Sequence, residues 1–204
     1  GRSWVGSIKG YNDKSLGQIM SNSFQDLNGN WIYNGKRVIN HYRSNTGATL
    51  ITQVNPADFP TGSEWNNLLS NIEKGIFSEI KNNPETGPAE IDINAYIDQP
   101  NFGKNLLADR SYATIIGNTV QVTVVLHNLI IYDNPDGTFT FNADIEIVLS
   151  DWFGVSESDF ADIDMATIFA GSSLTAFWIL QHQRGYKPFI NEYHLKTSIS
   201  NATN

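Results

Sequence analysis

The sequence predicts an α+β fold in which an antiparallel sheet with a long central hairpin packs against two or three helices. Two stretches of alternating apolar residues, 119–132 and 138–151, are joined by a short turn sequence and predict the hairpin. Other stretches place apolar residues at helical spacing. We expect a single domain over 1–204, because a chain of this length can bury one sizeable core. An N-terminal part (1–62) precedes the helix, sheet, helices and last strand expected over 63–198.

The composition is that of a globular protein, with 40% hydrophobic and 12% aromatic residues. The formal net charge is −8, and the 13 lysine and arginine residues are scattered along the chain. No nucleic acid is expected as a partner, because its recognition needs a basic patch or stripe. The absence of cysteine excludes disulfides, thiol nucleophiles and thiolate metal sites. No transmembrane segment is expected, since no stretch approaches the roughly 20 apolar residues of a spanning helix.

The N-terminal part is rich in Asn, Gly and Ser and predicts short strands. In NWIYNGKRVIN an Asn-Gly pair stands between two strand-like runs. Both turn residues tolerate positive φ, so we predict a β-hairpin at Trp31–Ile39. The β-branched run 48–54 is the next predicted strand.

A helix is predicted from Ser63, which is a suitable N-cap. Apolar residues recur behind it at helical spacing as far as Ile80, and Gly75 weakens this helix without ending it. The sequence NPETGP ends the helix. Residues 90–97 then alternate polar and apolar side chains and predict a half-buried strand.

The first arm of the long hairpin changes phase around His127 and Asn128, as a β-bulge would produce. In the second arm, alternate residues from Phe139 to Leu149 share one apolar face. Asp151 falls in the same register. The strand therefore ends by placing an acid where its alternation requires an apolar side chain.

Two helices and a strand are predicted after the hairpin. Ser156 and Asp159 have the S-x-x-D spacing of a capping box, which predicts a helix through FADIDMATIFA. A second, very apolar helix is predicted over 173–183, with Gly185 at its C′ position. The alternation of KPFINEYHLKT predicts the last strand.

Asp151 is the first candidate catalytic residue. An acid at the inward end of a strand, followed by Trp152, Phe153 and the flexible Gly154, can lie at a cleft with a raised pKa or bind a cation. The structural alternative is an Asx turn, in which the carboxylate accepts backbone N–H groups where the strand passes to the helix. The sequence leaves both alternatives open.

His127 is the second candidate catalytic residue. It lies at the change of phase, and the opposing arm carries Asp144 and Glu146 on its more polar face. A histidine in this position can act as a general base or a ligand. A lone histidine on a strand can equally face solvent or take part in a structural network.

The segment LQHQRGYKPF concentrates hydrogen-bond donors, of which His182, Arg184 and Lys187 are further candidate catalytic residues. Together they can hold a phosphate or a carboxylate. The alternative is an ordinary helix C-terminus, where cations favour the negative end of the helix dipole.

Cofactor and metal stay unknown from the sequence. The turn sequence DNPDG at 133–137 lacks the acid spacing and the distal glutamate of a calcium loop. The Walker A, G-x-S-x-G and H-E-x-x-H motifs are absent as well.

The segments ADIEIVLSDWFGVSESDF and FWILQHQRGYKPFI resemble an uncharacterised bacterial domain family, found alone and as the C-terminal tail of secreted polymorphic-toxin proteins. The resemblance covers about residues 105–196. In this family a strand ends in Asp, which is followed by an aromatic residue or His, then by Phe-Gly and an aliphatic residue, with a second Asp a few residues later. Further along the chain come Trp with Leu-Gln, then an aromatic residue and Lys-Pro-Phe. The matching positions are Asp151, Phe153, Gly154, Val155, Asp159, Trp178, Leu180, Gln181, Tyr186, Lys187, Pro188 and Phe189. Trp152 stands where the family often has His.

The resemblance implies an effector or toxin domain of a secreted antibacterial protein, used in competition between bacteria. Such a domain is secreted or delivered into a target bacterium, where the periplasm is a site of action. A cognate immunity protein is the partner implied, and the family supplies no mechanism.

The chain is also similar, more weakly, to the colicin M type of bacteriocin, whose activity domain has an acid-aromatic motif after a β-strand. That activity domain cleaves the lipid-linked peptidoglycan precursor. Asp151 corresponds to the acid, with Asp159 and Arg184 as loose counterparts of a second acid and a basic residue. This similarity implies an envelope-directed hydrolase with a lipid-linked substrate. The alternative is a non-catalytic binding or structural module of a larger secreted protein, so the sequence leaves open whether the chain is an enzyme.

Overall fold

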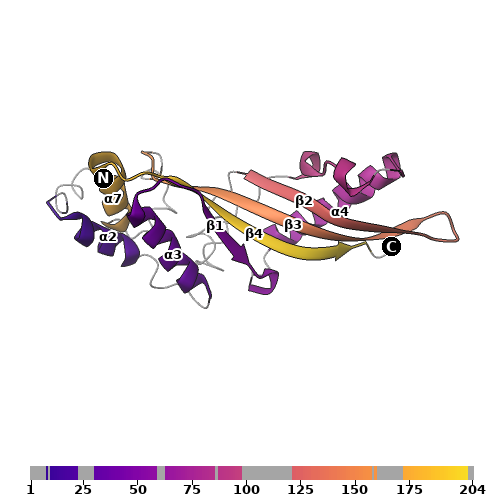
Figure 1. Cartoon of the computed structure of the whole chain (residues 1–204), viewed down its shortest axis with the longest axis horizontal. Helices are drawn as coiled ribbons and strands as arrows, with labels where there is room; N and C mark the ends of the chain where they lie inside the picture. Colours follow the sequence, from indigo (N-terminus) through magenta and orange to yellow (C-terminus); the bar gives the residue numbers. More distant parts are fainter. Residues whose placement is uncertain are drawn as a thin grey trace. The chain divides into compact units, whose positions relative to one another are not determined.

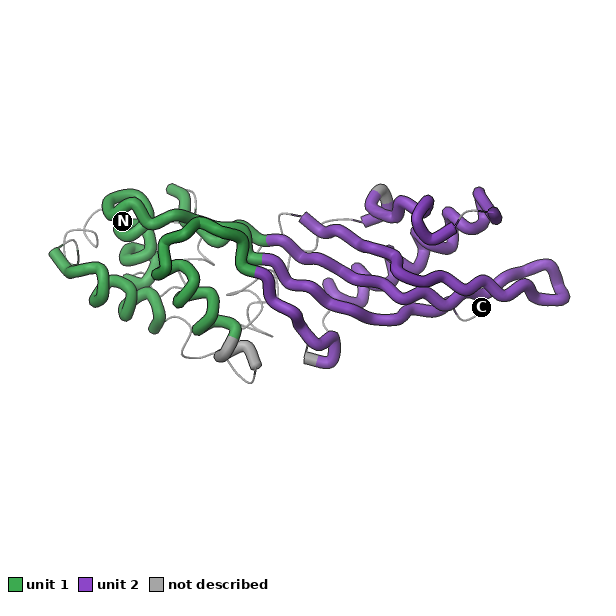
Figure 2. Tube along the Cα trace, viewed as in Figure 1, with its two compact units in different colours: residues 1–50, 102–118, 151–191 green, residues 51–101, 119–150, 192–204 purple. Residues whose placement is uncertain are grey.

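The computed structural model describes residues 8, 10–22, 30–58, 63–85, 87–97, 121–157, 159 and 172–201. It confirms the predicted α+β fold, with helices and a four-stranded mixed sheet of strand order β1–β4–β3–β2 (Figure 1). The chain divides into two compact units, each made of three separate segments (Figure 2). Unit 1 contains residues 1–50, 102–118 and 151–191, and unit 2 contains residues 51–101, 119–150 and 192–204.

The described helices of unit 1 are α2 (Asp13–Asn22), α3 (Asn30–Ser44) and α7 (Ser172–Trp178). α2 packs against α7, and at this contact the Ser173 hydroxyl donates to the Ile19 carbonyl at 2.7 Å. The packing therefore joins helices that are about 150 residues apart in the sequence.

The second predicted helix is confirmed, and it ends in a π-helical turn. α7 continues directly into this turn, η6 (Ile179–Gln183). Gly185 follows with φ +74°, the left-handed conformation that the predicted C′ position requires. The Tyr186 N–H closes the helix end by donating to the Leu180 carbonyl at 3.0 Å.

The hairpin predicted at Trp31–Ile39 is wrong, because α3 covers this stretch. Gly35, Val38, Ile39 and Tyr42 are buried, and they recur at the three- and four-residue spacing of a helix. Burial of this stripe in the core of unit 1 outweighs the turn preference of the Asn-Gly pair. Gly35 is also absent from the residues with positive φ, so it makes no tight turn.

Strands β2 (Gln121–Asp133) and β3 (Phe139–Phe153) pair in antiparallel fashion and confirm the predicted long hairpin. The register shifts between Leu126 and Asn128, so the predicted bulge is confirmed with His127 as the extra residue. The core-facing residues of β2 are even-numbered before the bulge and odd-numbered after it. The turn between the strands ends at Gly137, which has φ +83°.

Two further predicted strands are confirmed. β4 (Phe189–Ser200) lies between β3 and β1 (Leu50–Val54), and the 3₁₀ turn η1 (Pro56–Asp58) follows β1. Side chains of β3 and β4 touch in the pairs Glu146–His194 and Asp144–Ser198. The residue numbers of these pairs fall along β3 as they rise along β4, so the two strands are antiparallel.

In unit 2 the two faces of the sheet differ in chemistry. Alternate residues of β3 from Phe141 to Leu149 are buried, and α4 (Ser63–Asn82) packs on this face, where Phe77 stacks on Phe139 at 4.7 Å. α4 confirms the helix predicted from Ser63. The opposite face, called the polar face below, carries Asn128, Ile130, Tyr132, Asn142, Asp144, Glu146, Glu192, His194, Lys196 and Ser198.

The strand predicted over 90–97 is wrong. This segment forms two 3₁₀ turns, η2 (Pro88–Glu90) and η3 (Asn94–Tyr96). The Asp92 carboxylate accepts from both the backbone and the side-chain amide of Asn94 at 3.0 Å, an Asx turn that competes with extended backbone. Asn94 in turn accepts the outward-facing N–H of Val124, so a side chain from this segment occupies part of the edge of β2.

The ring of Tyr96 lies against Gly75 in the middle of α4, where an added Cβ would be 3.1 Å from the ring. We predict that Gly75→Ala is stabilising only in a Tyr96→Gly background, which removes both the ring and the Cβ of residue 96 from the helix. There it should gain about 1 kcal/mol from helix propensity, whereas in the native chain displacement of the ring offsets that gain. Urea unfolding of the four variants in this cycle measures the coupling. Additive effects would show that the ring does not restrict this position.

Candidate functional site

Asp151 lies near the end of β3, in register with the buried Leu149 and Phe153. The residue is half-buried, and protein atoms surround its carboxyl group. This burial raises the pKa of Asp151 to about 8, and a hydrogen bond to the backbone of Trp152 opposes the shift. The carboxyl group is therefore largely protonated at neutral pH, and it can donate a proton.

A close turn follows Asp151 and requires glycine at position 154. A Cβ on Gly154 would lie 2.6 Å from the indole nitrogen of Trp152 and 3.1 Å from Cβ of Pro188. The Gly154 N–H donates to the Trp152 carbonyl at 3.0 Å, which closes the turn. Trp152 is 51% exposed, and its side chain projects from the opposite face of β3 from Asp151, because successive residues of a strand face opposite sides.

An aromatic cluster in unit 1 anchors the strand end that carries Asp151. The ring of Phe153 lies 5.1 Å from Phe177 and 5.1 Å from Phe189, and 5.9 Å from the fully buried Tyr42. Such pairs add packing energy beyond the burial of their area. The Tyr42 hydroxyl has no hydrogen-bond partner among the described residues, and burial raises the pKa of Tyr42.

The side chain of Gln181 holds the backbone of Val155. Its carbonyl oxygen accepts from the Val155 N–H at 2.9 Å, and its amide donates to the Val155 carbonyl at 3.0 Å. Nε2 of His182 lies 2.8 Å from the same carbonyl and must donate to it. The candidate His182 therefore has a structural contact that fixes its proton on Nε2.

The predicted capping contact between Ser156 and Asp159 is present. The Asp159 carboxylate accepts from both the backbone N–H and the hydroxyl of Ser156. The helix predicted to follow through FADIDMATIFA lies outside the described residues. This contact and the Gln181 contact order the chain on the C-terminal side of Asp151.

Arg184 and Lys187 are exposed and take part in different contacts of unit 1. Nε of Arg184 lies 3.7 Å from the Asp13 carboxylate, while the Lys187 backbone N–H donates to the side chain of Asn45 at 2.7 Å. Within the described part of unit 1, no hydrogen bond or ion pair joins Asp151 to His182, Arg184 or Lys187. The structure places these four candidates in one unit without connecting them.

His127, the remaining candidate, belongs to unit 2 and takes part in a network on the polar face. Nε2 of His127 lies 3.0 Å from Glu146, the partner that the sequence placed on the opposing arm. Sequence reasoning missed three members: His194 lies 2.8 Å from Glu146 and 3.3 Å from Glu192, and Lys196 lies 3.8 Å from Glu146. The alternation of the last predicted strand could have indicated them, because it puts Glu192, His194 and Lys196 on one face.

These contacts control the charge of Glu146. The hydrogen bond from His194 is the main cause that lowers the pKa of Glu146, followed by the hydrogen bond from His127 and the charge of Lys196. The carboxylate is thus ionised at neutral pH. Among the described residues, no group of three or more His, Asp or Glu side chains has an arrangement that could hold a metal ion.

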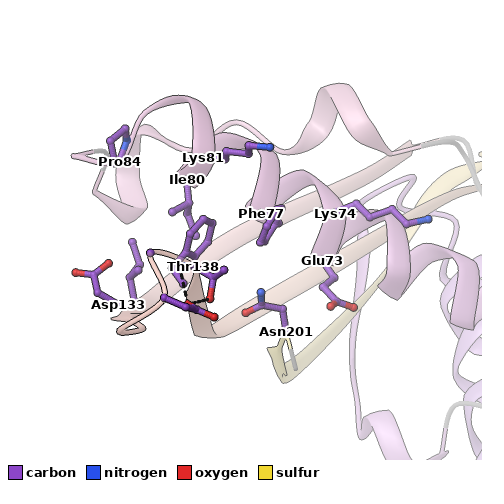
Figure 3. Close-up of a pocket in the computed structure, with 13 residues that line it drawn as sticks. Glu73, Lys74, Phe77, Ile80, Lys81, Pro84, Asp133, Thr138 and Asn201 are labelled. Carbon is purple, nitrogen blue, oxygen red and sulfur yellow. Dashed lines mark hydrogen bonds between the residues drawn. The ribbon is translucent and has the colours of Figure 1, made fainter. Parts of the chain in front are cut away.

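Unit 2 also has a groove of about 1020 Å³ between the C-terminal half of α4 and the end of the β2–β3 hairpin (Figure 3). Its apolar lining includes Phe77, Ile80, Ile131 and Phe139, and the charged residues are Glu73, Lys74 and Lys81 on the helix with Asp133 and Asp136 on the hairpin. This groove could not be predicted from the sequence, because it depends on where α4 crosses the hairpin.

Comparison with protein-family models, curated proteins and solved structures found no match for this chain. In the described part of the chain, no helix has the length and apolar character needed to cross a membrane.

The raised pKa of Asp151 makes folding depend on pH. Between its ordinary value, about 4, and about 8, the folded protein retains a proton that the unfolded chain has lost. We predict that the free energy of unfolding falls as pH rises through this range, by at most about 1.4 kcal/mol per pH unit. Asp151→Asn should remove this slope, measured by urea unfolding at a series of pH values.

The matched control for this experiment is Glu157→Gln, which neutralises an exposed acid in the same unit. This variant should keep the slope of the native chain. An Asp151→Asn protein whose slope equals that of the native chain would show that the Asp151 carboxyl titrates as an ordinary surface acid.

The paired hydrogen bonds of Gln181 should contribute measurably to stability. We predict that Gln181→Ala lowers the free energy of unfolding by about 1–3 kcal/mol, because the Val155 N–H loses its side-chain partner. Gln183→Ala changes an exposed neighbour and should stay within about 0.5 kcal/mol of the native chain. Equal stabilities of the two variants, measured by chemical denaturation, would contradict the role assigned to Gln181.

Proposed function

We propose that this chain is an effector domain of a secreted antibacterial protein, and that it acts as an envelope-directed hydrolase with Asp151 as the general acid. One observation supports the proposal: the half-buried carboxyl group of Asp151, whose surroundings raise its pKa to about 8, lies near the end of β3, just before the close turn at Gly154. A perturbed carboxyl group in such a position is typical of catalytic sites.

The chemistry follows from the protonation state. A protonated Asp151 gives its proton to the leaving-group oxygen as the bond to that oxygen breaks, while a water molecule bonds to the electrophilic atom and releases a proton, which restores the protonated acid. The close turn at Gly154 and the aromatic cluster under Phe153 hold the acid in place, as efficient proton transfer requires. The resemblance to colicin M type bacteriocins points to a lipid-linked envelope precursor as the substrate.

A second candidate function is a non-catalytic binding module of a larger secreted protein. The groove of unit 2 favours it, because an apolar floor edged by both positive and negative side chains suits a protein partner such as a cognate immunity protein. The contacts of His182, Arg184 and Lys187 within unit 1 also fit a structural role.

The two functions are separated by expressing the chain in a bacterium, with and without export to the periplasm. The hydrolase predicts killing only after export, because the substrate lies in the envelope. Asp151→Asn should abolish killing while the protein stays folded, since the amide has nearly the same shape but no transferable acidic proton. Viable counts and lysis report the phenotype, and circular dichroism reports the fold.

Glu157→Gln is the control, because it removes an exposed carboxylate of the same unit and should kill as the native chain does. Killing that survives Asp151→Asn would remove Asp151 from the active site. Absence of killing from both compartments would overturn the stand-alone effector and favour the binding module.

A further inference from the structure

The polar face of unit 2 has a hollow of its own, of about 310 Å³, formed by strands β2, β3 and β4. Its lining is Asn128, Ile130, Asn142, Asp144, Ser198 and the adjoining Ile199 and Ser200. Amide, hydroxyl, carboxylate and aliphatic groups line it, and none of these residues is cationic. The α4 groove has a different lining, and Asp151 belongs to the other unit.

The register of the hairpin determines this lining. Asn128 lies opposite Asp144, and Ile130 lies opposite Asn142. Tyr132 is the next residue on this face, and the Asn142 amide lies 3.5 Å from its hydroxyl. The side chains of Ile130 and Tyr132 are 45% and 48% exposed. Ile130 therefore gives the hollow an apolar side, and Tyr132 adjoins the hollow through its contact with Asn142.

Asp144, which lines the hollow, is held in a fixed orientation. Its carboxylate accepts from the Ser198 hydroxyl at 2.7 Å and from the Asn128 amide at 3.3 Å. The hydrogen bond from Ser198, followed by that from Asn128, lowers the pKa of Asp144, so the group is ionised at neutral pH. Each carboxylate oxygen can still accept a further hydrogen bond from a ligand.

The two amides retain hydrogen-bonding groups for a ligand. The side-chain carbonyl oxygens of Asn128 and Asn142 have no partner among the described residues, and only one amide hydrogen of Asn128 is engaged. The hollow thus offers acceptors and donors side by side, prearranged by cross-strand contacts. A ligand that fits must carry several groups that both donate and accept.

We propose that this hollow binds a neutral oligosaccharide. Sugar hydroxyls both donate and accept, which matches the mixed amide and carboxylate lining, and the C–H face of a sugar ring can pack on Tyr132 and Ile130. An anionic ligand is disfavoured by the ionised Asp144 and by the lack of a lining cation. The proposal is independent of the role of Asp151.

The test is a titration of the full ¹⁵N-labelled chain with millimolar maltotetraose, cellotetraose and chitotetraose, followed by NMR. We expect at least one of these sugars to shift backbone resonances of residues 128–132, 142–144 and 198–200. Tyr132→Ala should weaken that binding roughly two- to tenfold, the loss expected for an aromatic contact. Asn142→Ala should weaken it as well, because it removes an amide from the hollow.

Val125→Ala is the matched control, since Val125 pairs with Glu146 on the same sheet and is 43% exposed, but it lies outside the hollow. It should bind the sugar as the native chain does. Each variant changes an exposed side chain, and its spectrum shows whether the fold is kept. The proposal is overturned if none of the three sugars shifts these resonances, if Tyr132→Ala and Asn142→Ala bind as tightly as the native chain, or if an Asn-rich peptide binds there and the sugars do not.

Discussion

The β-bulge at His127 is the constraint on which the structure of unit 2 depends. A shift of one residue in a strand exchanges its two faces, and here the shift takes place inside β2. Before the bulge, Val124 faces the core, and after it Leu129 and Ile131 do so. The bulge thereby keeps one apolar face over a hairpin of more than ten residues per arm, and it places Asn128 on the polar face.

Local periodicity predicted the long elements well. The hairpin, its bulge and α4 were evident because each shows a single period over many residues. The wrong predictions were two β-structures, a hairpin at Trp31–Ile39 and a strand at 90–97. In α3 a helical stripe centred on Val38 was hidden behind an Asn-Gly pair, and at 90–97 an alternating pattern was cancelled by the side chain of Asp92. In both cases a local sequence pattern favoured β-structure, and another interaction of the same residues determined the structure: burial of the helical stripe in α3 and the Asx turn of Asp92.

The candidate sites were only partly predictable, for a similar reason. Asp151 could be found from the sequence because it is an acid in the otherwise apolar register of its own strand. His194 could not be connected to Glu146, because that contact depends on β4 lying next to β3. The hollow around Asp144 depends on the same strand order. The sequence indicates which residues form strands, but it does not show which strands are neighbours in the sheet.

The position of β4 has a consequence for how the chain folds. This strand comes after all other described elements in sequence, yet it lies in the sheet between β1 and β3. A growing chain can form the β2–β3 hairpin early, but β1 has no neighbour until β4 has been made. Both units are also assembled from interleaved segments. Folding therefore requires contacts between distant parts of the chain, which is typical of slow folding, and the hairpin exposes an unpaired edge of β3 until β4 arrives.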